Sequence, residues 1–217
     1  MAGIQRRQFL KAAGIGLGAT AITCAGLGYL AVRTPTQSVD YYAHAGDGED
    51  KTYMKSKVLI AYASRLGSTG GVAQAISEEW TARGNVVDVK LAKDVRDVSS
   101  YGTVLLGSAV RMGRWLPEAI AFLEQNAGAL ASKSVSYFSV CMTMYEDTPE
   151  NRTRAQAITS AARAIQEPVA EGFFGGLMDY GKLSFLEQTI LRAKKTPEGD
   201  FRDWDAIRAW AKQISIV

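Results

Sequence analysis

The sequence predicts an α/β domain with a doubly wound, five-stranded parallel sheet, preceded by one N-terminal transmembrane or signal helix. From residue 57 onward, short apolar runs alternate with segments whose apolar residues recur at helical spacing. Ahead of them, Ala12–Val32 contains 21 residues and no charged side chain. We therefore divide the chain into a signal or membrane anchor at 1–33, a polar tether at 34–56 and a folded domain at 57–217.

Five apolar runs are expected to form the strands. The first, VLIAYA, is apolar at every position, which is typical of a parallel strand buried on both faces. The second alternates Val87 and Val89 with Asp88 and Lys90. In chain order, the expected strands are 58–63, 86–91, 103–106, 134–140 and 169–174.

Helices are expected between and after the strands. Val72, Ile76 and Trp80 repeat at every fourth position, and Gly84 provides a stop signal. Asp203 is placed to cap the last helix. The remaining helices are expected at 116–127, 155–165 and 204–214.

Three loops are candidates for a ligand site, because ligands of parallel sheets bind beyond the carboxyl ends of the strands. These loops are 64–71, 108–115 and 141–148, and all three are rich in Gly, Ser, Thr, Met and aromatic residues.

The N-terminal segment has the features of a membrane-targeting sequence. A helix of its 21 residues is about as long as the ~30 Å hydrocarbon core of a bilayer. Arg6, Arg7 and Lys11 precede the apolar stretch and Arg33 follows it, so the positive-inside rule places the domain on the extracytoplasmic side. The stretch RRQFLK resembles the twin-arginine signal, which exports proteins already folded around a cofactor. Small residues are poorly placed for cleavage, which favours an uncleaved anchor.

Composition excludes several classes of function. The net charge of +3 comes from the four basic residues of the leader, and the other 21 basic residues meet 22 acidic ones. Such a near-neutral domain does not indicate a nucleic-acid surface. With one histidine, His44, and two separated cysteines, Cys24 and Cys141, we expect no metal site, no Ser-His-Asp triad and no disulfide.

The loop SRLGSTGG between the first strand and the first helix predicts a phosphate site. Amides at a helix N-terminus attract anions, Gly67 and Gly70 permit close approach, and hydroxyls add donors. The loop has no GxxxxGK and no GxGxxG pattern, which disfavours nucleoside triphosphates and dinucleotides. A capped turn without any ligand is the alternative.

This loop resembles the phosphate loop of flavodoxins, whose pattern is Thr/Ser-x-Thr-Gly-x-Thr. Ser64, Gly67 and Thr69 match it, and Leu66 departs from it. The chain is most similar to the quinone-linked protoporphyrinogen dehydrogenase branch, through Arg65, the stretch GSAVRMG, the strand SYFSVCM and the terminal DFRDWDAIRAWAKQI. The resemblance implies a flavodoxin-like sheet of order 2-1-3-4-5 and FMN as the cofactor.

The resemblance also implies which residues bind FMN. The phosphate would be held by Ser64, Arg65, Gly67, Ser68 and Thr69. The isoalloxazine would be bordered by Ser108, Ala109, Val110, Arg111, Met112 and Gly113 on one side and by Cys141, Met142 and Thr143 on the other. Trp115 or Tyr145 would stack on the flavin or belong to the core. Arg111 would stabilise reduced flavin or form an ordinary surface ion pair. We identify no acid or base, which suits a cofactor that carries the electron chemistry itself.

The segment 175–196 leaves two interpretations open. Its apolar and basic residues suit an interfacial segment that meets lipid and admits a quinone or porphyrin-like substrate, or a helix packed on the sheet with a basic outer face.

Two functions follow from the resemblance. The first is a membrane-associated, FMN-dependent oxidoreductase that passes electrons between a reduced donor and quinone, and the second is a membrane-tethered flavodoxin-type electron carrier serving a redox complex. An FMN-free structural subunit is disfavoured by the intact phosphate loop. The export signal disfavours a role in haem synthesis, and the near-neutral domain disfavours a freely diffusing carrier.

Overall fold

The computed structural model describes residues 57–193 and 195–217. The expected leader and tether lie outside these residues. The described chain divides into two units, one formed by 183–193 with 195 and the other by the remaining described residues.

The larger unit is built on a parallel sheet, and its strand order confirms the predicted 2-1-3-4-5 topology. β1 pairs in parallel with both β2 and β3, and the order across the sheet is β2-β1-β3-β5-β6. The strands are β1 (Lys57–Ala63), β2 (Val86–Leu91), β3 (Thr103–Arg111), β5 (Ser134–Val140) and β6 (Ala170–Phe174).

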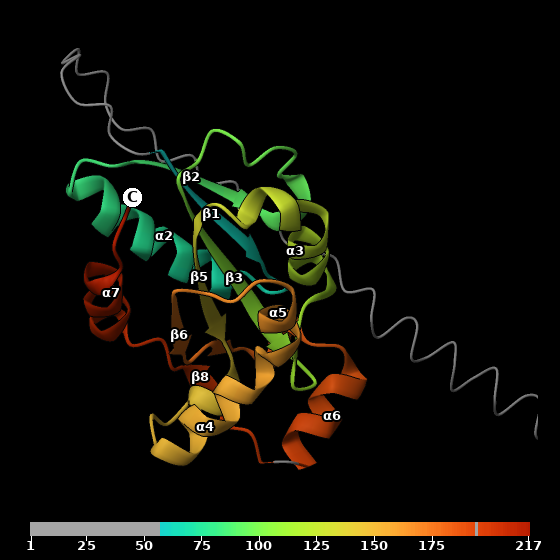
Figure 1. Ribbon diagram of the computed structural model, residues 1–217. Helices are drawn as coiled ribbons and strands as arrows, with labels where there is room; N and C mark the ends of the chain where they lie inside the picture. The colour runs from blue at the N-terminus through green and yellow to red at the C-terminus, as the bar shows by residue number, and fades with distance from the viewer. Residues whose placement is uncertain (1–56, 194) are drawn as a thin grey trace, which may run out of the picture. The chain divides into compact units, whose positions relative to one another are not determined.

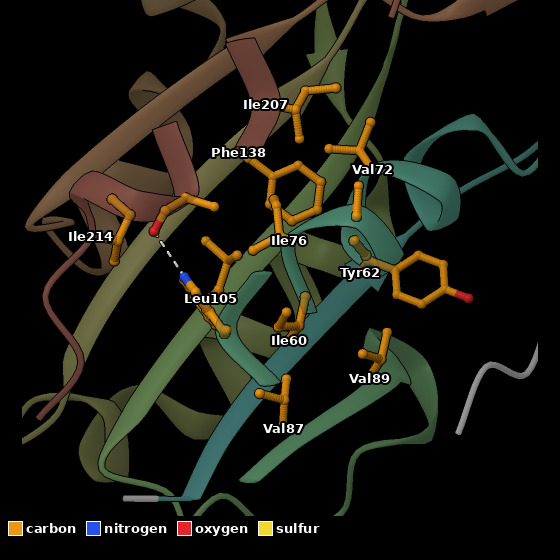
Figure 2. Close-up of a cluster of buried hydrophobic side chains, with 14 of the residues drawn as sticks. Ile60, Tyr62, Val72, Ile76, Val87, Val89, Leu105, Phe138, Ile207 and Ile214 are labelled. Atoms are coloured by element: carbon orange, nitrogen blue, oxygen red, sulfur yellow. Dashed lines mark hydrogen bonds between the residues drawn. The ribbon is translucent and has the colours of Figure 1, made fainter. Parts of the chain in front are cut away.

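Helices cover both faces of this sheet, as Figure 1 shows. On one face, α2 (Ser68–Ala82) and α7 (Trp204–Gln213) pack over a core that includes Ile60, Leu105 and Phe138, drawn in Figure 2. On the other face, α3 (Pro117–Leu130) and α5 (Ser160–Ile165) pack over the second core.

Helix boundaries follow the expected local signals. Gly84 ends the first helix with a φ of 85°, and its amide donates to the Thr81 carbonyl. Asp203 caps α7, because its Oδ1 accepts a hydrogen bond from the Ala206 amide at 2.9 Å. The single helix expected at 155–165 is instead two, α4 (Pro149–Ile158) and α5, separated by the buried Thr159.

The third strand is longer than predicted. It runs on to Arg111 and turns back into β4 (Arg114–Trp115) as an antiparallel hairpin. Met112 and Gly113 form the two-residue turn with φ values of 52° and 74°, the backbone that tight hairpins need. A second small hairpin pairs β7 (Leu177–Met178) with β8 (Gly199–Asp200). Strand β7 lies within the segment 175–196, and β8 follows that segment.

The smaller unit contains α6 (Phe185–Ala193), which carries its own N-terminal cap. Ser184 and Glu187 form a reciprocal capping box, in which the Glu187 carboxylate accepts from the Ser184 amide at 3.1 Å and the Ser184 hydroxyl accepts from the Glu187 amide at 3.4 Å. No residue of α6 is buried, and Phe185 is 86% exposed. Within 57–193 and 195–217, no helix is long and apolar enough to span a membrane.

Candidate functional site

The candidate site lies at one edge of the sheet, where β1, β3 and β5 reach their carboxyl ends. Because these strands are parallel neighbours, the loops that follow them begin at the same edge. The topology therefore brings together the three loops that the sequence singled out (Figure 1). The first contains Ser64–Thr69, the second Ser108–Gly113 and the third Cys141–Thr143.

The loop after β1 is held in shape by its own backbone and one serine. Ser64 is buried, and its Oγ accepts a hydrogen bond from the Gly67 amide at 3.1 Å. Gly67 is the N-cap of α2 with a φ of 89°, a conformation that favours glycine. Because glycine has no side chain, it provides no cap for the first amides of the helix. These amides and the helix dipole favour an anion.

Thr69 has a buried hydroxyl that makes no hydrogen bond to any of the residues that the structure describes. Its side chain is fully buried in the first turn of α2. A buried hydroxyl without a partner costs about 1–3 kcal/mol, so such a group calls for an explanation. A phosphate oxygen bound at the helix N-terminus would accept a hydrogen bond from this hydroxyl and would explain why it has no partner among the described residues.

Two glycines of this loop have different surroundings: Gly67 faces open space, and Gly70 is closely packed. A Cβ on Gly67 would meet no heavy atom within 4 Å, whereas a Cβ on Gly70 would lie 3.2 Å from the Tyr62 ring. Open space at Gly67 leaves room for a ligand beside the backbone. The close approach at Gly70 lets the buried Tyr62 pack beneath the start of α2.

The loop after β6 forms an additional wall that sequence reasoning missed. A Cβ on Gly176 would lie 3.3 Å from Val140 and 3.8 Å from the Ser68 hydroxyl, so this loop lies against the phosphate loop. At Gly175 a Cβ would come within 2.1 Å of the Phe201 carbonyl oxygen. The Gly-Gly pair directly after a strand was the available signal, because it permits such close backbone approach.

Arg202 is a second residue that sequence reasoning missed. Its Nη1 lies 2.8 Å from the position of a Cβ on Gly71, and its guanidinium stacks on Trp204 at 4.5 Å from the ring centroid. Its Nε donates to Asp200 Oδ1 at 2.8 Å, and this partner holds the pKa of the Asp200 carboxyl below its usual value. A cation thus lies beside the first turn of α2.

In the second loop, the structure gives Ser108 a structural role. Its buried hydroxyl donates to the Ala109 carbonyl at 2.8 Å and accepts from the Leu116 amide at 3.0 Å. Val110 pairs with Trp115 across the hairpin, and Arg111 pairs with Arg114. The hairpin thus places its turn, Met112 and Gly113, beyond the sheet edge, where Met112 is 93% exposed.

The third loop is partly buried. Cys141 is buried, its amide donates to the Phe174 carbonyl at 3.0 Å, and burial raises the pKa of its thiol. Met142 and Thr143 are half-buried in the 3₁₀ turn η2 (Met142–Met144). Burial thus disfavours the thiolate form of Cys141, which is the reactive form of a thiol.

Of the two aromatic residues considered for stacking, Trp115 belongs to the core. It is buried, its Nε1 donates to the Ser139 hydroxyl at 2.8 Å, and its ring meets Tyr137 edge-on at 5.0 Å. Tyr145 is 40% exposed and meets Phe201 edge-on at 6.1 Å. Tyr145 is thus the aromatic of this pair that remains available to a ligand.

The arrangement fits a phosphate monoester. The first turn of α2 offers amides without a side-chain cap, a buried hydroxyl without a partner at Thr69 and open space at Gly67. Neutral donors of this kind bind a dianion without a lysine. In the part of the chain that the structure describes, no cluster of His, Cys, Asp or Glu could hold a metal ion.

Comparison with known proteins identifies similar chains. The flavodoxin domain family matches residues 59–205. The protoporphyrinogen IX dehydrogenase (quinone) of Leishmania major is 24% identical over 175 residues, which cover 74% of this chain and 75% of that protein. An NAD(P)H dehydrogenase (quinone) of Cupriavidus metallidurans is 30% identical over 95 residues, which cover 34% of this chain and 48% of that protein.

Among solved structures, oxidised flavodoxin 2 from Bacillus cereus has a TM-score of 0.48 and 24% identity, covering 72% of this chain and 96% of that one. The family match supports FMN, the cofactor that the phosphate loop implied.

Proposed function

Because the chain belongs to the flavodoxin domain family, we propose that it is an FMN-dependent oxidoreductase that passes electrons between a reduced donor and a quinone at a membrane surface. The observation that carries this proposal is the loop Ser64–Thr69 at the start of α2, which we call the cradle. It combines helix amides that have no side-chain cap with the buried hydroxyl of Thr69, which has no partner among the described residues.

In this proposal, the phosphate of FMN is bound by Ser64, Gly67, Ser68 and Thr69, with the guanidinium of Arg65 in the same loop. Ser64 fixes the loop through its bond to the Gly67 amide. The hairpin turn and the loop at Cys141–Thr143 border the ring. When bound, FMN supplies the electron transfer between donor and quinone. The protein's own residues bind, orient and shield the cofactor.

Shielding comes from apolar and backbone groups. Tyr62 and Val140 are buried beside the cradle, and Gly176 brings the loop after β6 against both Val140 and Ser68. A low-dielectric surround strengthens each hydrogen bond to the phosphate.

The proposal of a quinone as electron acceptor is supported by two relatives, both of which are named as quinone dehydrogenases. The exposed apolar residues of α6, Phe185, Leu186 and Ile190, add a second support. Arg192 and Lys195 lie at its C-terminal end. An apolar face with basic residues suits a helix that lies in a lipid interface, where a lipid-soluble quinone is present.

We place the domain on the extracytoplasmic side, tethered by the segment Ala12–Val32 behind the RRQFLK motif. Export of a protein already folded around FMN is consistent with the twin-arginine resemblance. Fractionation of cells that produce the full chain tests this, because Arg6→Lys with Arg7→Lys would leave the protein on the cytoplasmic side. Unchanged export of that variant would contradict the assignment.

The proposed cofactor and reaction are tested on the full chain purified in detergent. We expect a yellow protein that releases FMN on denaturation and transfers electrons to a soluble quinone. A colourless preparation that takes up no added FMN would refute the proposal. FMN binding without quinone reduction, together with a co-purifying redox complex, would instead identify the tethered electron carrier.

The role of α6 is tested by Phe185→Ser with Ile190→Ser. Because both side chains are exposed, the fold should keep its stability. We expect the KM for a long-chain quinone to rise, while the KM for a short, water-soluble quinone stays unchanged. An equal effect on both quinones would contradict an interfacial role.

A further inference from the structure

Arg202 is held against the first turn of α2 by contacts from a distant part of the chain. Its side chain carries a permanent charge and yet is only 15% exposed. The Asp200 carboxylate accepts hydrogen bonds from Nε at 2.8 Å and from Nη2 at 2.5 Å, and the guanidinium lies over the Trp204 ring. Two of the three guanidinium nitrogens are thus fixed, and the planar group has little freedom to turn.

The third guanidinium nitrogen, Nη1, lies beside the helix. The three nitrogens radiate from Cζ, so a carboxylate bound to the Nε and Nη2 edge lies on the side opposite Nη1. Nη1 is 2.8 Å from the position that a Cβ on Gly71 would occupy. The positive arm of the ion pair therefore lies against α2, and the Asp200 charge lies on its far side.

The position of Gly71 places this nitrogen on the ligand side of the helix. Residues three and four apart share one face of a helix, and their Cβ bonds tilt toward its N-terminus. Gly71 follows Ser68 by three positions and Gly67, the N-cap with open space around it, by four. Nη1 therefore lies on the same face of α2 as the Ser68 side chain and the open space at Gly67.

A second set of contacts leads to the same place. The Phe201 amide donates to the Gly176 carbonyl at 3.0 Å, and a Cβ on Gly176 would lie 3.8 Å from the Ser68 hydroxyl. The residue directly before Arg202 is thereby joined to the loop that lies against the cradle. Two independent routes through the structure thus bring Arg202 to the start of α2.

This arrangement also explains why residue 71 is a glycine. Gly71 lies within α2 and is not one of the glycines with a positive φ, so its backbone does not require glycine. Glycine is less favourable than alanine inside a helix. A Cβ at this position would displace the Arg202 guanidinium, so the second glycine of STGG provides room for a cation.

We propose that Arg202 binds the phosphate of FMN from outside the loop at 64–69 and gives the cradle its preference for a charged flavin over an uncharged one. This inference rests on the proposed function and adds a residue to its cofactor site. Nη1 donates to the phosphate, and the α2 amides and the Thr69 hydroxyl donate to other oxygens of the same group. Riboflavin has the same ring without the phosphate, so it gains nothing from this cation.

The test compares the binding of FMN and riboflavin to the flavin-free full chain in detergent, by the quenching of flavin fluorescence. The variant is Asp200→Asn with Arg202→Gln, which keeps the net charge and leaves no unpaired carboxylate near the phosphate. The control is Arg163→Gln with Glu171→Gln. It removes another partly buried Arg–carboxylate pair, with side chains 31% and 14% exposed, which joins α5 to β6.

We expect the unchanged protein to bind FMN about a hundredfold more tightly than riboflavin. The variant without the Asp200–Arg202 pair should bind FMN about tenfold more weakly and should bind riboflavin as before. The control variant should keep both affinities, because its ion pair contacts neither α2 nor the loop that follows β1.

Gly71→Ala provides a second variant, which removes no charge. Alanine favours the helix, so the midpoint of thermal unfolding should not fall. The added Cβ displaces Nη1, so FMN affinity should fall about three- to fivefold while riboflavin affinity stays unchanged. Glutamine is shorter than arginine, so adding Gly71→Ala to the variant without the ion pair should have no further effect on FMN affinity.

Three results would overturn the inference: equal binding of FMN and riboflavin, a preference for FMN that the loss of the Asp200–Arg202 pair leaves unchanged, or an equal loss of FMN affinity in the control. The proposed function fails separately, because an unchanged protein that binds neither flavin refutes it. A protein that binds FMN with a preference independent of residue 202 refutes the role of Arg202 alone.

Discussion

Replacing Thr69 by valine should raise the stability of the FMN-free protein and weaken FMN binding at the same time. Valine has nearly the shape of threonine and differs by a methyl group in place of the hydroxyl. The Thr69 hydroxyl is fully buried and makes no hydrogen bond within the residues that the structure describes. Its removal therefore relieves a desolvation cost without breaking a bond.

The magnitude follows from these contacts. An unsatisfied buried hydroxyl costs about 1–3 kcal/mol, and threonine and valine have similar helix propensities. The free energy of unfolding should thus rise by about 1–3 kcal/mol, and the midpoint of thermal unfolding should rise by about 2–4 °C for each kcal/mol. A hydrogen bond to a charged phosphate contributes about 1.5–3 kcal/mol, so FMN affinity should fall about 10- to 150-fold.

Urea unfolding of the FMN-free protein and quenching of flavin fluorescence on titration measure the two quantities. Thr159→Val is the matched control, because Thr159 is equally buried but its hydroxyl donates to the Gln156 carbonyl at 3.0 Å. That variant should lose about 1 kcal/mol of stability and keep its FMN affinity. A Thr69→Val protein that is less stable and binds FMN normally would refute the assignment of Thr69 to the phosphate.

Three further predictions concern the scaffold. Trp115→Phe leaves the buried Ser139 hydroxyl without its 2.8 Å partner, so the free energy of unfolding in urea should fall by about 1–3 kcal/mol. FMN affinity should stay unchanged, and a loss of FMN affinity would contradict the core role of Trp115. Gly107→Ala places a Cβ 1.9 Å from the Phe138 ring and should lower the free energy of unfolding by about 3 kcal/mol or more. Gly128→Ala lies in open space on α3 and should raise the free energy of unfolding by up to about 1 kcal/mol. Equal shifts of the thermal midpoint in the two variants would contradict this reasoning. Burial opposes the ionisation of Asp88, but the Tyr101 hydroxyl and the Lys57 ammonium outweigh it and hold its pKa below the usual value. Its contribution to stability is complete above about pH 4, the pKa range of an unfolded Asp, and is lost as the pH falls further. The stability advantage over Asp88→Asn should therefore shrink as the pH falls below about 4, and a pH-independent gap would contradict the ion cluster.

Two features of the candidate site lower the stability of the protein when no ligand is bound. Thr69 has a buried hydroxyl without a partner among the described residues, and Met112 adopts a left-handed backbone. Each feature is unfavourable for the chain alone, and a ligand that supplies a hydrogen-bond acceptor would offset the cost at Thr69. Their concentration at one edge of the sheet is what the proposed function explains.

Local patterns in the sequence were sufficient to predict the sheet, and they also pointed to the loop 64–71 as the candidate phosphate site. Apolar runs such as VLIAYA and the repeat of Val72, Ile76 and Trp80 are determined by burial, which acts along short stretches of chain. The glycines and hydroxyls of SRLGSTGG also act locally, because a helix N-terminus binds an anion with its own amides.

Tertiary structure decided which polar groups were already satisfied and which side chains met. From sequence alone, Ser108 and Thr69 look alike, yet the Leu116 amide reaches Ser108 while Thr69 is left without a partner among the described residues. Trp115 became a core residue because strand pairing brought Ser139 to its indole. Gly176 joined the cradle because β6 ends beside β5, and Arg114 faced Arg111 because the hairpin set their register. These contacts join residues far apart in the chain or depend on an exact register, so only the folded arrangement fixes them.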